Sequence, residues 1–271
     1  MTAHTASLSG LLRDPSKTPE HVNGVPAFLS AAQIAGLKRQ QESHGENGFK
    51  DFFKRWPGLY GALVWLVGPS FFTGMTPAKF MNKFPHGGTV LHAGSGTRVL
   101  PGDCLNIDLF PFPGVDALAD LEALPFLDGA FAGATCDQVL EHVPHPALVT
   151  AELRRVVKSG GLIHVASPFV FPWHPSPSDY TRWTQEGLAA LFPDCELVEK
   201  GVMAGPCSAL TALLAAFCAT LFCFGSRKLQ SVLQYLFLIL FAPVKFFDLG
   251  LAHMPGAELC AANFYVVVRK R

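Results

Sequence analysis

The segment Val90–Thr97, with the sequence VLHAGSGT, decides the fold of this chain. It begins with a short apolar, β-prone run and leads directly into the turn Gly94-Ser95-Gly96. Glycine has no Cβ and tolerates positive φ, so such a turn lets the backbone approach a ligand closely. Ligands of open α/β sheets bind at the carboxyl ends of the strands. The segment therefore predicts a strand that ends at a binding site, although similar turns also occur as simple tight turns.

A second predicted strand, Cys104–Asp108 (CLNID), ends in a carboxylate. An acid at this place in nucleotide-binding α/β folds accepts the hydroxyls of a ribose. The alternative is an exposed turn aspartate ahead of Pro111 and Pro113. Thr97, Arg98 and Val99 contain no glycine where a dinucleotide fingerprint would continue, which argues against an NAD-dependent or nucleotide-sugar enzyme.

Strand and helix patterns alternate through the rest of the chain, which predicts parallel βαβ units. Because only about a dozen residues separate Gly96 from Asp108, the first crossover helix is expected to be very short or absent. Further strands are expected near 115–120 and at 131–137, 162–166, 196–202 and 264–269. Helices are expected at 31–41, at 147–157 with a glycine stop at 159–161, and at 188–192 behind a cap at Thr184.

Five segments in this order resemble the class I S-adenosylmethionine-dependent methyltransferases, in their small-molecule type 11 branch. They are VLHAGSGT at 90–97, NIDL at 106–109, ADLEALPF at 119–126, CDQVLEHV at 136–143 and LRRVVKSGG at 153–161. The resemblance implies an α/β fold with a Rossmann-like, seven-stranded, mostly parallel sheet whose last strand is antiparallel. Between strands 6 and 7 we expect an apolar helical insertion, and before the sheet we expect N-terminal helices. The implied cofactor is S-adenosylmethionine.

The same resemblance implies which residues contact the cofactor. Asp108 would meet the ribose, Asp120 and the Leu121 backbone would face the adenine, and Gln138 would lie near the reactive end. His92 stands where the family usually has an acid that holds the amino end of the cofactor. The implied set is His92, Gly94, Ser95, Gly96, Asp108, Leu109, Asp120, Leu121, Gln138 and Val139. Asp120 could instead cap a helix.

The loop at 167–184, SPFVFPWHPSPSDYTRWT, contains four prolines that stiffen it. It resembles the pattern H-P-x-x-x-D-Y-x-R-[FW]-T of related methyltransferases, which implies a substrate lid. The catalytic candidates, which could take a proton from an acceptor hydroxyl or amine, are His142, His174 and Tyr180. The substrate-binding candidates are Trp173, Asp179, Arg182 and Trp183. The alternative is a structural loop in which Asp179 pairs with Arg182 and Trp183 packs into the core.

No metal site is expected from the sequence. The seven cysteines form no C-x-x-C pair and lie mostly in apolar runs, as reduced thiols of an intracellular protein do. His142 and His145 are three residues apart, but Pro144 between them favours a loop over a metal site. The 21 basic and 21 acidic residues balance, which disfavours nucleic acid as a substrate.

Two uncharged runs, 202–226 and 229–244, flank Arg227 and Lys228. Each approaches the roughly 20 residues that span a bilayer. Both ends must return to one sheet, so a full crossing would place the two cations on the far side, against the positive-inside tendency. We expect a helix pair that contacts one leaflet through 207–247. A two-pass hairpin and a dry cap of buried helices over the active site are the alternatives.

These patterns predict a protein at the inner face of the membrane, peripheral or monotopic, that methylates a small-molecule acceptor of lipid or lipid-linked type. A catalytically idle relative, acting as a membrane-associated binding or scaffold protein, is the alternative that His92 favours. The expected organisation is an N-terminal helical or lid region at 1–80, which begins with a flexible polar stretch without a signal-peptide pattern. A methyltransferase domain at 81–204 and 261–271 would enclose the apolar insertion at 205–260. An apolar stretch at 49–72 is expected to lie on a surface or join the lid.

Overall fold

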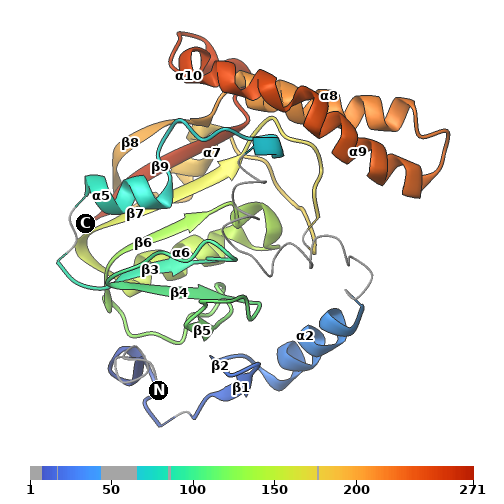
Figure 1. The fold of residues 1–271 in the computed structure, drawn as a ribbon. Helices are drawn as coiled ribbons and strands as arrows, with labels where there is room; N and C mark the ends of the chain where they lie inside the picture. The colour runs from blue at the N-terminus through green and yellow to red at the C-terminus, as the bar shows by residue number, and fades with distance from the viewer. Residues whose placement is uncertain (1–7, 17, 44–65, 85–86, 176) are drawn as a thin grey trace.

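A computed structural model describes residues 8–16, 18–43, 66–84, 87–175 and 177–271. One twisted sheet lies at the centre of the protein, and a pair of long helices projects from one end of it (Figure 1). The sequence expectations of a flexible start and of an apolar helix at 49–72 fall largely outside the described residues, and they stay predictions. The proposed domain boundaries also stay predictions.

Over the described residues the sheet has nine strands, in the order β1-β2-β5-β4-β3-β6-β7-β9-β8. Neighbours from β2 to β7 are parallel, whereas β9 is antiparallel to both β7 and β8. This confirms the predicted mostly parallel sheet with an antiparallel last strand, and the hairpin β1–β2 extends it by two strands beyond the expected seven. The strands are β1 Glu20–Val22, β2 Val25–Ala27, β3 Val90–Ala93, β4 Cys104–Asp108, β5 Ala117–Leu118, β6 Phe131–Asp137, β7 Val157–Pro168, β8 Cys195–Ala204 and β9 Asn263–Lys270.

Helices cover both faces of the sheet. α6 (Pro146–Val156) buries Val149, Leu153 and Val156 in the main core, next to residues of β3 and β6. On the other face, α5 (Pro77–Lys83) begins at a proline behind the Thr76 cap and fully buries Phe80. α7 (Gln185–Ala190) starts as predicted, because the Thr184 hydroxyl accepts the N–H of Gly187 at 3.0 Å.

The predicted glycine stop of α6 is wrong. The helix ends at Val156, Val157 is already extended, and β7 runs from Val157 through the glycines at 160 and 161. Val157 is buried and pairs with Phe131 of β6, so strand pairing begins before the glycines are reached. Between β3 and β4, residues 94–103 contain turns and no helix, which confirms the missing first crossover helix.

Two N-terminal elements flank the sheet. α2 (Ala31–Ser43) confirms the helix predicted from 31–41. The short 3-10 helix η1 (Ser9–Leu11) lies beside Phe126, which forms an isolated bridge with Leu12.

An antiparallel helix pair fills the predicted insertion. α8 (Pro206–Leu221) follows β8 directly and packs along α9 (Arg227–Phe241); η4 (Ala242–Phe247), α10 (Asp248–Leu251) and η5 (Ala257–Cys260) then lead back to β9. All residues of α9 are described, and none is buried. The alternative of a dry cap made of two buried helices is therefore wrong. Of the described helices, the stretch Arg227–Leu251 is long and apolar enough to cross a membrane by length and composition.

Candidate functional site

The turn after β3 is held against the end of β4. The N–H groups of Gly94 and Ser95 both donate to the carbonyl of Ile107, at 2.9 and 3.0 Å. Gly94 and Gly96 have φ of +70° and +55°, which favour glycine. A Cβ on Gly94 would lie 2.3 Å from a Val139 methyl, whereas one on Gly96 would meet no atom of the described residues within 4 Å. The turn is therefore packed on the Val139 side and open at Gly96.

Asp108 closes the turn from the neighbouring strand. Its Oδ2 accepts the N–H of Gly96 at 2.8 Å, and its Oδ1 accepts the N–H of Phe110 at 2.9 Å. The residue is buried, so the alternative of an exposed turn aspartate is wrong. Burial raises the pKa of this carboxyl, while the backbone bonds oppose the rise. The N–H of Leu109 is a third backbone donor, so one of the roughly four acceptor sites of the carboxylate stays unused.

Two predicted cofactor residues are buried beside this turn. The Oγ of Ser95 is buried and has no hydrogen-bond partner among the described residues. His92 lies within β3 and contacts Asn106 of β4, with Nδ1 3.0 Å from Oδ1. Burial lowers the pKa of His92 to about 4, so the ring is neutral near pH 7. A neutral ring cannot provide the negative charge of the acid that the family usually has there.

The predicted adenine side lies after β5. Asp120 accepts from Gln33 Nε2 of α2 at 2.6 Å and from the N–H of Glu122 at 2.9 Å. The second bond spans two residues and forms an Asx turn, so Asp120 does not cap a helix as the alternative supposed. Leu121 is buried, and Leu109 is partly exposed at the end of β4. The contact with Gln33 brings α2 to the edge of the predicted site.

At the end of β6, Gln138 adopts φ of +58° and connects three elements. Its N–H donates to Ala166 of β7, and its Oε1 accepts from Asn263 Nδ2 at 2.7 Å. Its Nε2 donates to Asp137, whose carboxylate also lies 3.8 Å from the Arg98 guanidinium. Burial raises the pKa of Asp137 to about 6. Asp137 and Asn263 were not predicted as site residues.

Arg182 cross-links the loop between β7 and α7, which is called the stapled loop below. This side chain donates to both oxygens of Asp179 and to the carbonyls of Phe171, Pro172 and Thr181. The guanidinium lowers the pKa of Asp179 to about 2. Trp183 packs partly against the main core. The structural interpretation of this loop is therefore correct for both features, and it does not exclude contact with a substrate.

The stapled loop docks onto the short 3-10 helix η3 (Leu140–His142). The Tyr180 N–H donates to the Glu141 carbonyl at 2.7 Å, and the Thr181 hydroxyl donates to the Leu140 carbonyl at 3.2 Å. Nδ1 of His142 lies 2.6 Å from the Ser178 carbonyl. The Tyr180 side chain is 55% exposed and that of Trp173 is 75% exposed, so the structure leaves both on the outer surface of the loop.

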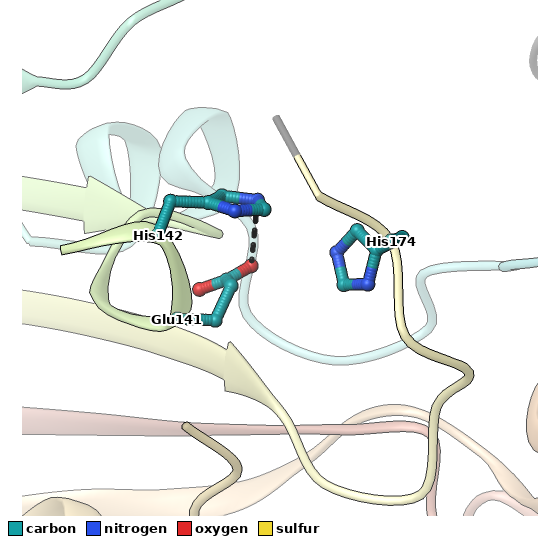
Figure 2. Close-up of side chains that lie close together, drawn as sticks. All are labelled: Glu141, His142 and His174. Atoms are coloured by element: carbon teal, nitrogen blue, oxygen red, sulfur yellow. Dashed lines mark ion pairs between the residues drawn. The ribbon is translucent and has the colours of Figure 1, made fainter. Parts of the chain in front are cut away.

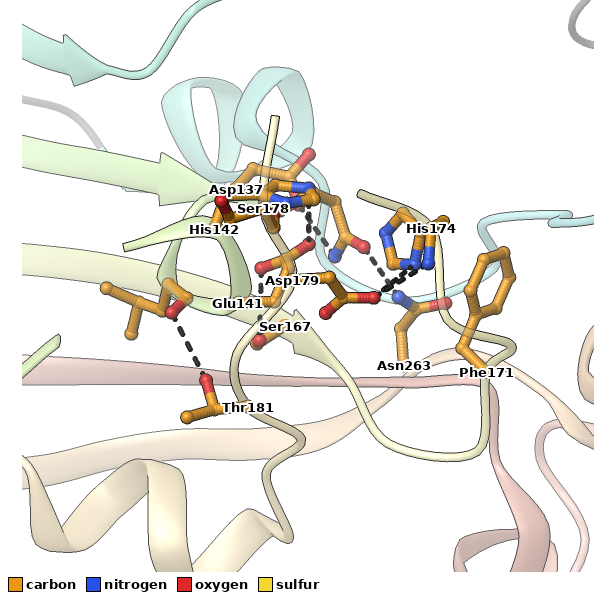
Figure 3. A network of polar contacts seen from close by, with 12 residues as sticks. Asp137, Glu141, His142, Ser167, Phe171, His174, Ser178, Asp179, Thr181 and Asn263 are labelled. Carbon is orange, nitrogen blue, oxygen red and sulfur yellow. Dashed lines mark hydrogen bonds and ion pairs between the residues drawn. The ribbon is translucent and has the colours of Figure 1, made fainter. Parts of the chain in front are cut away.

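This docking brings Glu141, His142 and His174 together (Figures 2 and 3). The two imidazole rings meet edge to face with centroids 5.2 Å apart, and His142 Nε2 lies 3.8 Å from Glu141 Oε1. Glu141 is fully buried, and burial raises its pKa to about 8. Burial also lowers the pKa of His174. Two of the three catalytic candidates are thus adjacent, and Glu141 was missed.

Glu141 carried a signal in the sequence. It is an acid in the mostly apolar run Val139–Val143. An acid in such a run is either exposed at the surface or buried with a partner. Its meeting with His174 could not be read from the chain, because 33 residues separate them and Ser178 and Thr181 fix the contact.

The residues of the first turn fit S-adenosylmethionine. The buried hydroxyl of Ser95, which has no partner among the described residues, the space at Gly96 and the remaining acceptor site of Asp108 suit a ligand with ribose hydroxyls and a polar amino-acid tail. These three groups lie at the carboxyl ends of β3 and β4, where open α/β sheets bind their ligands. The roles of the individual residues stay predictions.

A comparison with protein families matches residues 110–165 to the methyltransferase domain model Methyltransf_11. The match runs from the end of β4 through β5, β6 and α6 into β7. A 37.1 kDa uncharacterized protein from transposon Tn4556 of Streptomyces fradiae is 39% identical over 69 residues, which are 25% of this chain. The aligned part of this chain spans only 19% of that curated relative.

Solved structures with a similar architecture include methyltransferases. Phosphoethanolamine N-methyltransferase 2 of Haemonchus contortus, in complex with S-adenosyl-L-methionine, has 15% identity and a TM-score of 0.47, covering 82% of this chain and 60% of that one. The [4+2]-cyclase SpnF has 15% identity and a TM-score of 0.46, covering 80% of this chain and 95% of that one. At these values the similarities carry no weight for function.

The strand order and the family match agree with the resemblance seen in the sequence. The seven strands β5-β4-β3-β6-β7-β9-β8 carry the glycine turn at β3, the buried acid at β4 and an antiparallel β9. The matched residues form the adjoining part of the same sheet. The match to the methyltransferase domain model over residues 110–165, together with this strand order, supports the resemblance to the class I S-adenosylmethionine-dependent methyltransferases, type 11, with S-adenosylmethionine as the implied cofactor.

Proposed function

We propose that this methyltransferase methylates a small lipid or lipid-linked acceptor at a membrane surface. The observation that carries the proposal is the exposed apolar surface of α8 and α9, which are joined to the site. This surface contains Leu210, Leu213, Phe217 and Leu221 of α8, and Leu229, Val232, Leu236, Ile239 and Leu240 of α9. Phe217 is 63% exposed, and Phe224 at the tip is 88% exposed.

The spacing of these residues favours contact with a lipid surface. On each helix most of them recur every three or four residues, so they form an apolar stripe along each helix. Exposed apolar patches of this extent mark protein or membrane contacts. No acidic residue occurs between Lys200 and Lys245, while Arg227 and Lys228 lie at the tip, so the charge suits anionic headgroups.

Taken alone, α8 and α9 are each shorter than a membrane span, although the stretch Arg227–Leu251, which continues α9 through η4 and α10, has 25 residues. α8 has 16 residues and α9 has 15, so they are about 24 and 22 Å long at 1.5 Å per residue. A hydrocarbon core is about 30 Å thick. A hairpin of this length, with cations at its tip, favours a monotopic position on one leaflet over two passes. We place the protein at the inner face of the membrane.

The hairpin adjoins the acceptor side of the site. Val170 and Phe171 of the stapled loop pack on a small apolar cluster that contains Ala209 of α8. The Phe171 ring contacts the His174 ring with centroids 5.0 Å apart. A lipid lying on α8 would therefore reach the loop that carries His174 without leaving the membrane surface.

In methyl transfer the protein has to position the acceptor, and it does not need to supply a nucleophile of its own. The cofactor supplies the electrophilic methyl group, which moves by in-line displacement to the acceptor. The chain's residues bind, orient and desolvate the acceptor. His142 and His174 lie where a proton released by an acceptor hydroxyl or amine could be taken up, and their role as bases stays part of the proposal.

The cofactor arm of the test is calorimetry of the purified full chain with S-adenosylmethionine, beside Asp108→Ala. Micromolar binding that Asp108→Ala weakens at least tenfold supports the site. No binding by well-folded wild type would overturn enzymatic function and favour the idle binding or scaffold protein, for which His92 is the main observation.

The membrane arm uses flotation with vesicles of phosphatidylcholine and phosphatidylglycerol. We expect wild type to float, and Phe217→Ser with Leu236→Ser to reduce flotation several-fold. Leu148→Ser is the matched control, because Leu148 is similarly exposed but lies on α6. Transfer of labelled methyl from the cofactor to a lipid extract then separates an enzyme from an idle relative. Equal flotation of all variants would contradict the membrane proposal.

A further inference from the structure

We infer that Glu141, His142 and His174 bind one divalent transition-metal ion on the acceptor side of the site. One ligand atom from each residue lies within 4.8 Å of the others. Two of the residues come from η3 and one from the stapled loop, so the ligand set exists only because the loop docks there. Figure 2 shows the three side chains facing one another.

An unpartnered carboxylate oxygen points to a cation in this cluster. Glu141 is fully buried; its Oε2 accepts from the Ser167 hydroxyl at 3.2 Å, whereas its Oε1 has no hydrogen-bond partner among the described residues. A buried polar oxygen without a partner is costly, and metal coordination is one way to compensate it. The nearby Arg182 is committed to Asp179 and to loop carbonyls.

Both imidazoles are oriented as metal ligands usually are. Nδ1 of His142 lies 2.6 Å from the Ser178 carbonyl and donates to it, so Nε2 is the ring nitrogen left to bind an ion. Nδ1 of His174 lies 3.0 Å from the Pro172 carbonyl and 3.3 Å from an Asp179 oxygen, two acceptors that favour the same tautomer over the competing Arg182 contact. Metal-bound histidines commonly donate their other N–H to such groups.

The geometry needs a small closure. A tetrahedral ion with bonds of about 2.0–2.2 Å holds its ligand atoms roughly 3.4 Å apart. The cluster atoms lie within 4.8 Å of one another, so a side-chain movement of about 1 Å suffices. His174 lies on a loop and His142 on a single 3-10 turn, and both can rotate without moving a strand.

The ligand types select the ion. Two imidazoles and one carboxylate suit Zn²⁺, Fe²⁺, Co²⁺ or Mn²⁺, and three protein ligands leave coordination positions open. If the proposed function holds, an acceptor oxygen takes an open position and becomes more acidic there. The two histidines would then be ligands rather than bases, and the expectation of no metal would be replaced.

The test is metal binding, which does not depend on turnover. The full chain is stripped with a chelator and titrated with Co²⁺, followed by visible absorption, and with Zn²⁺, followed by calorimetry. We expect one equivalent to bind with micromolar affinity or better. Glu141→Gln and His174→Ala are expected to weaken binding at least tenfold, and His145→Ala, an exposed histidine of the same region, should leave it unchanged.

Each result has a defined meaning. Absence of saturable binding, or binding that survives both ligand substitutions, overturns the metal site. If Glu141→Gln does not fold, His174→Ala and His142→Ala carry the comparison. Calorimetry with S-adenosylmethionine on the same samples separates the proposals, because loss of cofactor binding with intact metal binding contradicts the enzymatic function alone.

Discussion

Arg182 donates two N–H groups to the Asp179 carboxylate, and one of these donors lies 2.7 Å from Oδ2. Asp179 also accepts the backbone N–H of His174 at 2.7 Å. The Asp179 side chain is 1% exposed. One buried ion pair therefore fixes both the shape of the loop and the place of His174.

Asp179→Asn should destabilise the protein by about 2 kcal/mol, because hydrogen bonds to a charged, buried partner are lost. Urea unfolding measures the change. The matched control is Asp194→Asn, which breaks the Arg154 pair at a carboxylate that is 87% exposed and should cost under about 0.5 kcal/mol. Equal costs at the two sites would contradict the stapling role.

Gly94→Ala should cost about 3 kcal/mol and abolish measurable cofactor binding, since the new Cβ would lie 2.3 Å from Val139 at a φ of +70°. Gly96→Ala meets no atom of the described residues within 4 Å and should cost only about 1 kcal/mol of backbone strain. Thermal unfolding and calorimetry check both. Adding Val139→Ala should recover part of the Gly94→Ala loss, and a failure to do so would show that strain rather than contact dominates.

His164 should contribute a loss of stability in mild acid, which opposes the gain from Glu141 and Asp137, whose pKa values burial raises to about 8 and about 6. The His164 ring is fully buried, its Nε2 lies 3.2 Å from the Met75 carbonyl, and burial lowers its pKa from 6.5 to about 4. Between these values the unfolded chain binds a proton that the folded protein does not, so the free energy of unfolding decreases as pH falls, by up to about 3 kcal/mol. His92 adds a loss of the same direction.

Urea unfolding at pH 7.5, 5.5 and 4.5 measures this slope. His164→Gln should remove the His164 contribution from it, while His145→Gln at an exposed position should leave it unchanged. An unchanged slope in His164→Gln would contradict the assignment.

Asp248 should anchor the hairpin. Its buried carboxylate accepts the N–H groups of Cys207 and Ser208, at 2.9 and 2.8 Å, and the Ser208 hydroxyl at 2.7 Å. These donors lie at the N-terminus of α8, where a negative charge is favourable. Asp248→Ala should cost about 3 kcal/mol and speed proteolysis within 206–251. Glu258→Ala, at an exposed acid nearby, is the control. Equal proteolysis rates for the two variants would contradict the anchoring role of Asp248.

The sequence predicted the strands best where apolar runs end in a marked residue. The strands Cys104–Asp108 and Phe131–Asp137 form at the expected bounds, because each is a β-prone run buried along most of its length. The glycines at 160 and 161 misled, since the pairing of Val157 with Phe131 outweighed the local preference for a helix stop. The hairpin β1–β2 was missed because its strands are three residues long.

The site was predictable where segments close together in the sequence form it. It was not predictable where distant segments meet. Gly94, Gly96 and Asp108 follow from a turn and the strand beside it. Asn263 was missed because it reaches Gln138 from the far end of the chain. Glu141 was missed because its neighbour His174 arrives on a loop whose docking depends on Ser178 and Thr181.

The antiparallel pair β8–β9 has one further consequence. Ala204 and Asn263 are register partners, and the Ala262 N–H donates to the Ala204 carbonyl at 2.9 Å. Everything from 205 to 262 therefore occupies the place of an ordinary hairpin turn. The helix pair is a replaceable module: a two-residue turn could close the same strands, so the sheet and the exposed apolar helices could have been acquired separately.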